Sequence, residues 1–355
     1  MTTTQPAFDL AVLIGRFQPF HLGHLALLRQ ALAQAPQVAV VMGSAFQART
    51  PKNPFTWRER AETIRLSLSP ADQARVHFVP VRDHYDEARW VAAVQAGVRT
   101  ACPTGRAARV ALIGHEKDAS SAYLTQFPGW TLVSAPRQHH IDGTHIRDAY
   151  FGNASTALSA TLAALSDAAP PCTLAFLQAW SALPHFEAMA QEWRMLQQYK
   201  ASWAAAPYPP VFVTVDTVVK CGQKVLLVQR GQPPGVGLLA VPGGFIEQRE
   251  TAYQSALREL REETRFNLLA STMQSALKGQ AVFDHPDRSQ RGRTITHAFF
   301  FDLGDRPLPE VLADDDAQAA VWVDISALPD MEDRFLDDHF HMLDHFLGLT
   351  PPLAD

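Results

Sequence analysis

The stretch that decides the fold of the first half of the chain is Gly15-Arg16-Phe17-Gln18-Pro19-Phe20-His21-Leu22-Gly23-His24. It follows an apolar run at residues 8–14 that predicts a buried strand, and it leads into an apolar-periodic run at 25–32 that predicts a helix. Backbone N–H groups at a helix N-terminus attract anions, and the arginine and two histidines of this stretch add further donors. We therefore expect a phosphate-binding turn here, rather than an ordinary strand-to-helix turn with surface histidines.

Strand and helix patterns alternate outward from this turn. Apolar runs predict further strands at residues 38–42, 76–81, 110–113 and 130–134. Between them, Thr56 and Glu59 have the spacing of a helix-capping box, and 90–94 reads as part of another helix. This alternation predicts a parallel sheet with right-handed crossovers, which binds ligands at the carboxyl ends of its strands. The polar clusters follow those ends, at residues 43–45, 49–56, 83–85, 114–118 and 141–147.

Length, charge and cysteine content limit the class of protein. The 355 residues suggest two domains, and the net charge of −5 gives no basic field for nucleic acid or an anionic membrane. The three cysteines are too widely spaced for a disulfide framework or a zinc site. Residues 1–6 are short and polar, so we expect no signal peptide, and no apolar run reaches the ~18 residues that span a bilayer. The expectation is a soluble cytoplasmic protein with small-molecule partners.

Two motifs in the first half resemble those of the nucleotidyltransferase superfamily. Residues 15–24 resemble its G-x-F-x-P-x-H-x-G-H motif, and 141–147 are similar to its second signature, usually I-S-x-T-x-I-R. The resemblance implies a Rossmann-like domain that transfers adenylyl groups, with His21, His24 and Arg16 as catalytic residues. The ATP-binding residues that it implies are Gly15, Arg16, Phe17, His21, His24, Thr144 and Arg147. Asp142 replaces the usual Ser, and we leave it out of the site because a carboxylate repels a triphosphate.

Further clusters look like the archaeal type of nicotinamide mononucleotide (NMN) adenylyltransferase. The matching segments are residues 114–118, residues 53–56 and Trp90. A cationic pyridinium stacks well on an indole face, so Trp90 is our first choice for the nicotinamide ring and Trp57 the weaker one. Arg49 would meet the mononucleotide phosphate, and Asn53 completes the expected NMN side. Lys117 and Asp118 fit a surface ion pair equally well, and we interpret His139 and His140 as flanking structure.

Residues 170–206 are expected to connect two domains. The segment 150–169 is rich in Ala and Ser, 172–200 is helical by pattern, and 204–210 contains several helix breakers. We therefore predict domains at 1–169 and 207–355. The helices could be a linker, an extension of the first domain or a surface for a homo-oligomer, and the sequence does not decide among them.

The second half contains an acidic helix at residues 251–264. Glu259, Glu262 and Glu263 share one face, and three carboxylates repel one another unless a cation lies among them. Hard oxygen ligands select Mg²⁺ or Mn²⁺. The opposite face is apolar and is expected to pack on a sheet; it carries Ala256, Leu257 and Leu260. On the helix alone, a solvated acidic face remains an equal alternative.

The loop before this helix completes a resemblance to the Nudix box, G-x5-E-x7-R-E-U-x-E-E-x-G-U. The resemblance implies an α/β/α sandwich over a mixed sheet, in which Glu259, Glu262 and Glu263 bind metal and activated water attacks a nucleoside diphosphate. Gly244 would let the backbone approach, and Glu250 and Arg258 would pair to hold the loop. The box fails at one fixed position, where Arg265 replaces the last Gly. We expect a different helix exit there and an intact metal site.

A downstream segment at residues 282–297 resembles ADP-ribose-hydrolysing Nudix domains. Its Arg288, Arg291 and Arg293 could meet phosphate or ribose, although a solvated loop arginine is the common alternative for any one of them. Residues 314–316 are three consecutive aspartates. They could supply an extra metal ligand or simply form a solvated loop.

The whole chain thus resembles the bifunctional NMN adenylyltransferase/Nudix hydrolase family. The resemblance implies that the first domain makes NAD and pyrophosphate from ATP and NMN, and that the second cleaves ADP-ribose to AMP and ribose 5-phosphate, with Mg²⁺ or Mn²⁺ in both. One alternative is adenylylation of pantetheine phosphate or flavin mononucleotide beside a Nudix domain of other specificity. Another is a non-catalytic ADP-ribose sensor, which the intact glutamate triad disfavours.

Overall fold

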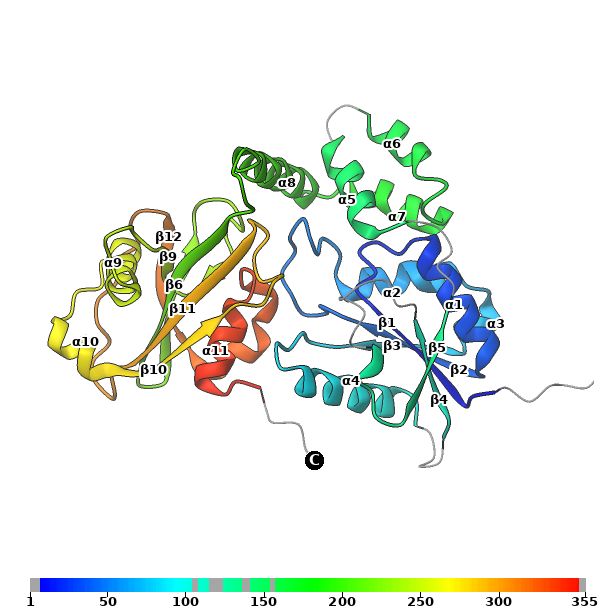
Figure 1. Cartoon of the computed structure of the whole chain (residues 1–355), viewed down its shortest axis with the longest axis horizontal. Helices are drawn as coiled ribbons and strands as arrows, with labels where there is room; N and C mark the ends of the chain where they lie inside the picture. Colours follow the sequence, from blue (N-terminus) through cyan, green and yellow to red (C-terminus); the bar gives the residue numbers. More distant parts are fainter. Residues whose placement is uncertain (1–6, 104–107, 115–123, 136–140, 154–156, 351–355) are drawn as a thin grey trace, which may run out of the picture. The chain divides into compact units, whose positions relative to one another are not determined.

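The computed structural model of the chain describes residues 7–103, 108–114, 124–135, 141–153 and 157–350. The chain divides into two compact units between Gln191 and Glu192. Figure 1 labels most of their helices and strands. Among the described residues, no helix combines the length and the apolarity needed to cross a membrane.

The first unit is built on a parallel sheet of five strands in the order β3-β2-β1-β4-β5. Its strands are β1 (Leu10–Gly15), β2 (Gln37–Met42), β3 (Val76–Pro80), β4 (Val110–Gly114) and β5 (Trp130–Ser134). The order reverses direction beside β1, and ligands bind at such a switch point in open parallel sheets. The parallel sheet expected from the alternating pattern is confirmed.

Helices pack on both faces of this sheet. One face carries Leu13 and Val40 and packs against α1 (Leu22–Gln34), whereas the other carries Val12 and Val41 and packs against α4 (Glu87–Ala101). Alternate residues of each strand therefore enter two separate hydrophobic clusters, as a doubly covered sheet requires. The remaining helices of this part are α2 (Trp57–Leu66) and α3 (Pro70–Gln73).

Helices α5 (Gly143–Gly152), α6 (Leu158–Ala164), α7 (Pro171–Trp180) and α8 (His185–Ser202) follow the sheet. The segment 172–200 is helical by pattern, and the structure divides it into α7 and α8 at residues 181–184, where Pro184 disfavours helical geometry at the preceding residue. We expected a connector at 170–206. The boundary between the compact units lies inside α8.

The second unit is built on a mixed sheet in the order β10-β11-β6-β7-β12, with β8 on β7 and β9 on β6. Its long strands are β6 (Val211–Cys221), β7 (Lys224–Arg230), β10 (Leu277–Phe283), β11 (Arg293–Asp302) and β12 (Ala317–Asp324); β8 (Leu239–Ala240) and β9 (Gly243–Phe245) are short. Strands β6 and β11 run parallel, and the other pairs are antiparallel.

Helices cover both faces of the mixed sheet, with α9 and α11 on either side of β6 and β11 in Figure 1. Ala256 and Leu260 of α9 pack into one hydrophobic cluster, and Phe340 and Leu343 of α11 pack into the other. The expected α/β/α sandwich is confirmed. The covering elements are α9 (Ala252–Thr264), α10 (Ala270–Ala276), α11 (His339–Leu347) and the 3-10 turns η2 (Ile325–Asp330) and η3 (Glu332–Arg334).

Candidate active sites

The backbone conformation of the turn between β1 and α1 sets the positions of its side chains. Phe17 adopts a positive φ of 52°, and its ring is 1% exposed. A Cβ at Gly15 would lie 3.0 Å from that ring, so the glycine leaves room for the phenyl group to pack beneath the strand end. Phe17 is thus a core residue, and it can offer a nucleotide only backbone atoms. Arg16, next to it, is exposed.

The two histidines of the turn cap α1 and hold each other. The His21 Nδ1 accepts from the His24 backbone N–H at 3.3 Å, and the His24 Nδ1 accepts from the His21 N–H at 3.4 Å. Their rings stack with centroids 3.6 Å apart. Because each Nδ1 is an acceptor, the neutral tautomer carries its proton on Nε2. In that tautomer both rings carry an Nε2–H donor.

The second motif packs directly on the first. The Arg147 Nη1 donates to the Gln18 carbonyl, and its Nη2 donates to the Thr144 Oγ1 at 3.1 Å. A Cβ at Gly143 would lie 2.7 Å from the same Gln18 carbonyl oxygen, so only glycine fits this contact. The start of α5 and the turn before α1 are therefore locked together, as a shared phosphate site requires.

Asp142 is the N-cap of α5, and its Oδ1 accepts from the His145 N–H at 2.8 Å. Ser and Asp are both preferred N-caps because each offers a side-chain oxygen to the first turn. The departure from the usual Ser thus has a structural explanation, and leaving Asp142 out of the phosphate contacts is consistent with its position.

A third arginine, which the sequence analysis did not single out, supports this site. Arg60 of α2 is 2% exposed; it donates to the carbonyls of Arg16, Gly43 (2.9 Å) and Ser44 (3.2 Å). Burial lowers the pKa of Arg60 to about 10, and burial together with the charge of Arg16 lowers that of Arg147 to about 10. Both stay charged at neutral pH, and both donate to carbonyls of the turn after β1, Arg60 to that of Arg16 and Arg147 to that of Gln18. In the sequence, Arg60 could have been found as a lone arginine on the face of α2 that is otherwise apolar and buried.

The residues expected on the NMN side have varied surroundings. Arg49 forms a two-pronged ion pair with Glu59, and Asn53 is buried, with its Nδ2 donating to Gln47 at 2.7 Å. Trp90 on α4 is partly buried and packs edge-on against Phe127 at 5.7 Å. The weaker choice, Trp57, lies under the Arg58 guanidinium at 4.9 Å. Residues 115–118, His139 and His140 lie outside the described residues.

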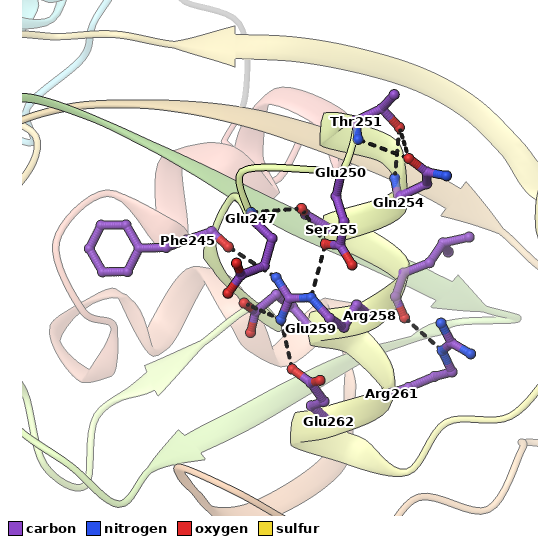
Figure 2. A network of polar contacts seen from close by, with 11 residues as sticks. Phe245, Glu247, Glu250, Thr251, Gln254, Ser255, Arg258, Glu259, Arg261 and Glu262 are labelled. Atoms are coloured by element: carbon purple, nitrogen blue, oxygen red, sulfur yellow. Dashed lines mark hydrogen bonds and ion pairs between the residues drawn. The ribbon is translucent and has the colours of Figure 1, made fainter.

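In the second unit, Arg258 is the centre of the loop–helix contacts (Figure 2). It pairs with Glu250 at 2.9 Å, with Glu259 at 2.9 Å and with Glu262 at 2.7 Å, and its Nη2 donates to the Phe245 carbonyl at 3.1 Å. The Glu250 carboxylate also accepts from the Ser255 hydroxyl at 2.7 Å. The predicted Glu250–Arg258 pairing is thus present, and it ties the loop before α9 to the helix.

Glycines bring the β9 backbone against the acidic face of α9. A Cβ at Gly244 would lie 2.4 Å from the Glu259 carboxyl carbon, and the Gly243 N–H donates to Glu263 Oε2 at 3.0 Å. Burial, with the charge of nearby Glu259, raises the pKa of Glu263 to about 8, although the hydrogen bond from Gly243 opposes this. Burial also raises the pKa of Glu259, against the effect of Arg258. The ionised forms of both carboxyl groups are therefore disfavoured here, because the site is poorly solvated.

This donor set fits a hard divalent cation. Carboxylate oxygens are the ligands that Mg²⁺ and Mn²⁺ favour, and a cation would stabilise the ionised forms of the buried Glu263 and the partly buried Glu259. As they stand, no three His, Cys, Asp or Glu side chains within the described ranges converge closely enough to hold an ion. Glu262 is turned onto Arg258, which supplies the positive charge between it and Glu259. A cation bound here would compete with Arg258 for the Glu262 carboxylate, and the ligand roles stay predictions.

The expectation of a different helix exit at Arg265 is wrong. Arg265 adopts left-handed geometry, φ 49° and ψ 21°, which is the conformation a Gly C-cap would have. Its guanidinium pairs with Asp314 at 2.8 Å. The ion pair holds the side chain at the surface while the backbone follows the usual path. Asp314 thus has a structural partner, and Asp315 lies close enough to Glu259 to raise its pKa.

The three arginines of the 282–297 segment differ in environment. Arg288 is 6% exposed and uses Nε and Nη2 for two 2.8 Å bonds to Asp338, which suits building a pocket wall rather than contacting phosphate. Arg291 lies over the Phe245 ring at 5.0 Å, and its buried Nε has no hydrogen-bond partner in the described part of the chain. Arg293 donates to the Asp284 carbonyl. Arg288 and Arg291 line one pocket, together with Asp216, Gly243, Gly244 and His339.

Comparisons with known proteins match both units. The cytidylyltransferase-like family model matches residues 12–148, and the NUDIX domain model matches 210–346. A nicotinamide/nicotinic acid mononucleotide adenylyltransferase of Acinetobacter baylyi is 37% identical over 188 residues, 53% of this chain and 94% of that protein. An ADP-ribose pyrophosphatase of Methanocaldococcus jannaschii is 37% identical over 117 residues, 33% of this chain and 64% of that protein.

Solved structures match the whole chain. The crystal structure of a bifunctional NMN adenylyltransferase/ADP ribose pyrophosphatase from Francisella tularensis is 34% identical with a TM-score of 0.87, covering 96% of this chain and 99% of that chain. A structure of the same name in complex with AMP and Mn ion is 32% identical with the same TM-score. Fold and sites define a nucleotidyltransferase-type unit joined to a Nudix unit. The chain belongs to the bifunctional NMN adenylyltransferase/ADP-ribose pyrophosphatase family.

Proposed function

We propose that the first unit transfers the adenylyl group of ATP to NMN, giving NAD and pyrophosphate. The observation that carries this is the group of Arg16, Arg60 and Arg147 around the His21–His24 turn, at the carboxyl end of β1. The names of the A. baylyi and F. tularensis relatives support the choice of NMN. Phe17 and Gly15 serve the site by shaping the turn.

In this reaction a phosphate oxygen of NMN attacks the α-phosphorus of ATP, and the bond to the β-phosphate oxygen breaks. No side chain needs to act as a nucleophile, so the protein positions the two substrates and offsets developing charge. The Nε2–H groups of His21 and His24 would donate to the reacting phosphate. Arg147 and Thr144, at the start of α5, would hold the β- and γ-phosphates that leave as pyrophosphate. Arg49, Asn53 and Trp90 would bind NMN.

For the second unit, we propose hydrolysis of ADP-ribose to AMP and ribose 5-phosphate. A water molecule attacks one phosphorus of the diphosphate, the bridging P–O bond breaks, and each product keeps one phosphate. Glu259, Glu262 and Glu263 would hold Mg²⁺ or Mn²⁺, which lowers the pKa of water and offsets phosphate charge. Arg291 and Arg293 would contact the substrate, and Arg288 would fix the pocket wall through Asp338. A divalent cation would also accompany ATP in the first unit.

A substrate panel on one preparation tests both proposals. With Mg²⁺ or Mn²⁺, we expect NAD and pyrophosphate from NMN plus ATP, and AMP plus ribose 5-phosphate from ADP-ribose, as measured by chromatography. Pantetheine phosphate and flavin mononucleotide should be poor acceptors. Consumption of either of these without NAD formation would overturn the acceptor. Tight ADP-ribose binding without any AMP release would favour a sensor over a hydrolase.

A further inference from the structure

Arg49 is held by a single carboxylate in a fixed orientation. Its Nη1 donates to Glu59 Oε2 at 2.7 Å, and its Nη2 donates to Glu59 Oε1 at 2.9 Å. The second Nη1 hydrogen goes to the Pro54 carbonyl at 2.6 Å. Glu59 therefore binds the end of the guanidinium fork, through both terminal nitrogens. Such two-pronged pairs fix the guanidinium plane as well as its position.

This arrangement leaves the side edge of the Arg49 guanidinium available. Arginine has five N–H donors, and the contacts above use three of them. Within the described residues, Nε–H and one Nη2–H make no hydrogen bond. These two donors are parallel and spaced to match two oxygens of one phosphate. The side chains of Arg49 and Glu59 are 29% and 24% exposed, so a solute can reach the pair.

Glu59 is itself fixed by the start of α2. Its Oε2 accepts from the Thr56 N–H at 2.7 Å and from the Thr56 hydroxyl at 3.0 Å, which completes the capping box. Burial acts to raise the pKa of Glu59, but hydrogen bonds from Arg49 and Thr56 outweigh it and hold the pKa below its usual value. The carboxylate is charged at neutral pH, and one rigid group both caps the helix and orients the arginine.

Helix α7 places an aromatic side chain beside Arg49. The ring of Trp180 lies 5.9 Å from the Arg49 Cζ, is 1% exposed and packs on Phe55 at 5.1 Å. A buried indole cannot move aside, so it limits the directions in which Arg49 can turn. Arg49 is thus held on one side by a charge and bordered on another by an aromatic ring.

We propose that Glu59 is a positioning residue for the adenylyl acceptor: it presents the Nε–Nη2 edge of Arg49 to the phosphate monoester of the acceptor nucleotide. This rests on the proposed function of the first unit. In the competing interpretation, Glu59 blocks Arg49 and a phosphate must displace it. The two interpretations predict opposite changes when the charge of Glu59 is removed.

The test is the steady-state kinetics of Glu59→Gln in the full-length protein. Gln keeps the shape and one acceptor oxygen but loses the charge-assisted pair, so we expect the KM for NMN to rise about 10-fold. We expect kcat and the KM for ATP to change less than about twofold, because the phosphate of bound NMN orients Arg49 once it has bound. An unchanged KM for NMN would overturn the proposal. A lower KM would also overturn it, and would support the interpretation in which Glu59 blocks Arg49.

A double-mutant cycle separates positioning from helix capping. If Glu59 acts through Arg49, then Glu59→Gln should have no further effect on the KM for NMN in an Arg49→Ala background. Additive effects would mean that Glu59 acts through the helix alone. Thr56→Ala is the matched control: it weakens the same cap, but the Thr56 N–H and Arg49 still bind Glu59, so the KM for NMN should rise much less than in Glu59→Gln.

Two readouts keep the outcomes distinct. ADP-ribose hydrolysis by each variant reports the amount of active protein in the preparation, because it depends on the other unit, and an unchanged KM for ATP reports that the first unit has folded. If the wild-type protein makes no NAD, the proposed function fails; if it makes NAD and Glu59→Gln behaves as wild type, only the positioning role fails. Glu62→Gln, which removes an exposed ion pair with Arg65 on the same helix, should be silent.

Discussion

Gly244 has no side chain, and the Glu259 carboxyl occupies the place that a Cβ would need. The nearest carboxyl atoms lie 2.4–2.5 Å from the ideal Cβ position. Only the far end of a flexible side chain is in the way, so a methyl group there would displace the carboxylate and leave the β9 backbone in place. The glycine therefore controls where a candidate metal ligand can lie.

Gly244→Ala is expected to lower ADP-ribose hydrolysis by roughly 100-fold, because a catalytic group moved by about 1 Å loses that much rate. NAD formation, measured on the same sample, should stay within about twofold. Gly279→Ala is the matched control in this unit, since its Cβ would meet nothing nearer than 3.5 Å. Equal hydrolysis by wild type and Gly244→Ala would refute the assigned position of Glu259.

Single residues also mark what the sequence could not predict. The two departures from the motifs, Asp142 and Arg265, are each explained by one backbone role: a cap for α5 and a left-handed C-cap of α9. The left-handed conformation of Arg265 could not be read from residue type, because arginine rarely adopts it. The Arg49–Glu59 pair depends on how the loop at 49–56 folds back, which periodicity does not report.

At the scale of elements, α8 is attached to the second unit by a buried glutamate. The Glu192 Oε2 accepts from the Gly235 N–H, in the loop between β7 and β8, at 2.9 Å. Its buried Oε1 has no hydrogen-bond partner within the residues described. Burial raises the pKa of Glu192, although the hydrogen bond from Gly235 acts against this. A charged carboxylate here is therefore costly.

Glu192→Gln should remove a pH dependence of stability. Because the folded-state pKa lies above the unfolded value near 4.5, folding favours the protonated form, and this stabilisation is lost as the pH rises through the raised pKa. Wild type should lose stability relative to Glu192→Gln as the pH rises from 4.5 through the raised pKa of Glu192. Urea unfolding, with hydrogen exchange in β6 as the probe for this unit, measures the difference.

The control for this change is Glu187→Gln, on the exposed face of the same helix. It should keep the pH dependence of the wild type. Parallel pH profiles for wild type and Glu192→Gln would contradict a raised pKa at Glu192.

The elements themselves followed from the sequence because their cause is local. Apolar runs predicted β1 to β5, and Thr56 with Glu59 predicted the capping box of α2, which is confirmed. The acidic and apolar faces of α9 followed from the helical period, and the cluster around Ala256 and Leu260 confirms the apolar one. The role of α7 beside Arg49 did not follow, since contact between distant segments has no periodic signature.

At the scale of the whole molecule, two units with separate cores carry two candidate sites. Each site is assembled from residues of its own unit, and both handle adenosine phosphates under our proposal. One chain thus carries two proposed activities whose residues do not overlap. A variant of the histidine turn or of the Nudix-type acidic face should therefore lose one activity and keep the other.

The most direct measurement assays NAD formation and AMP release on the same preparations of wild type, His24→Ala and Glu262→Gln. His24→Ala should lower NAD formation by roughly 100-fold or more, as expected for loss of a donor to a developing charge, and leave AMP release within about twofold. Glu262→Gln should do the reverse. Joint loss of both activities in a folded variant, or the absence of either activity in wild type, would contradict the account.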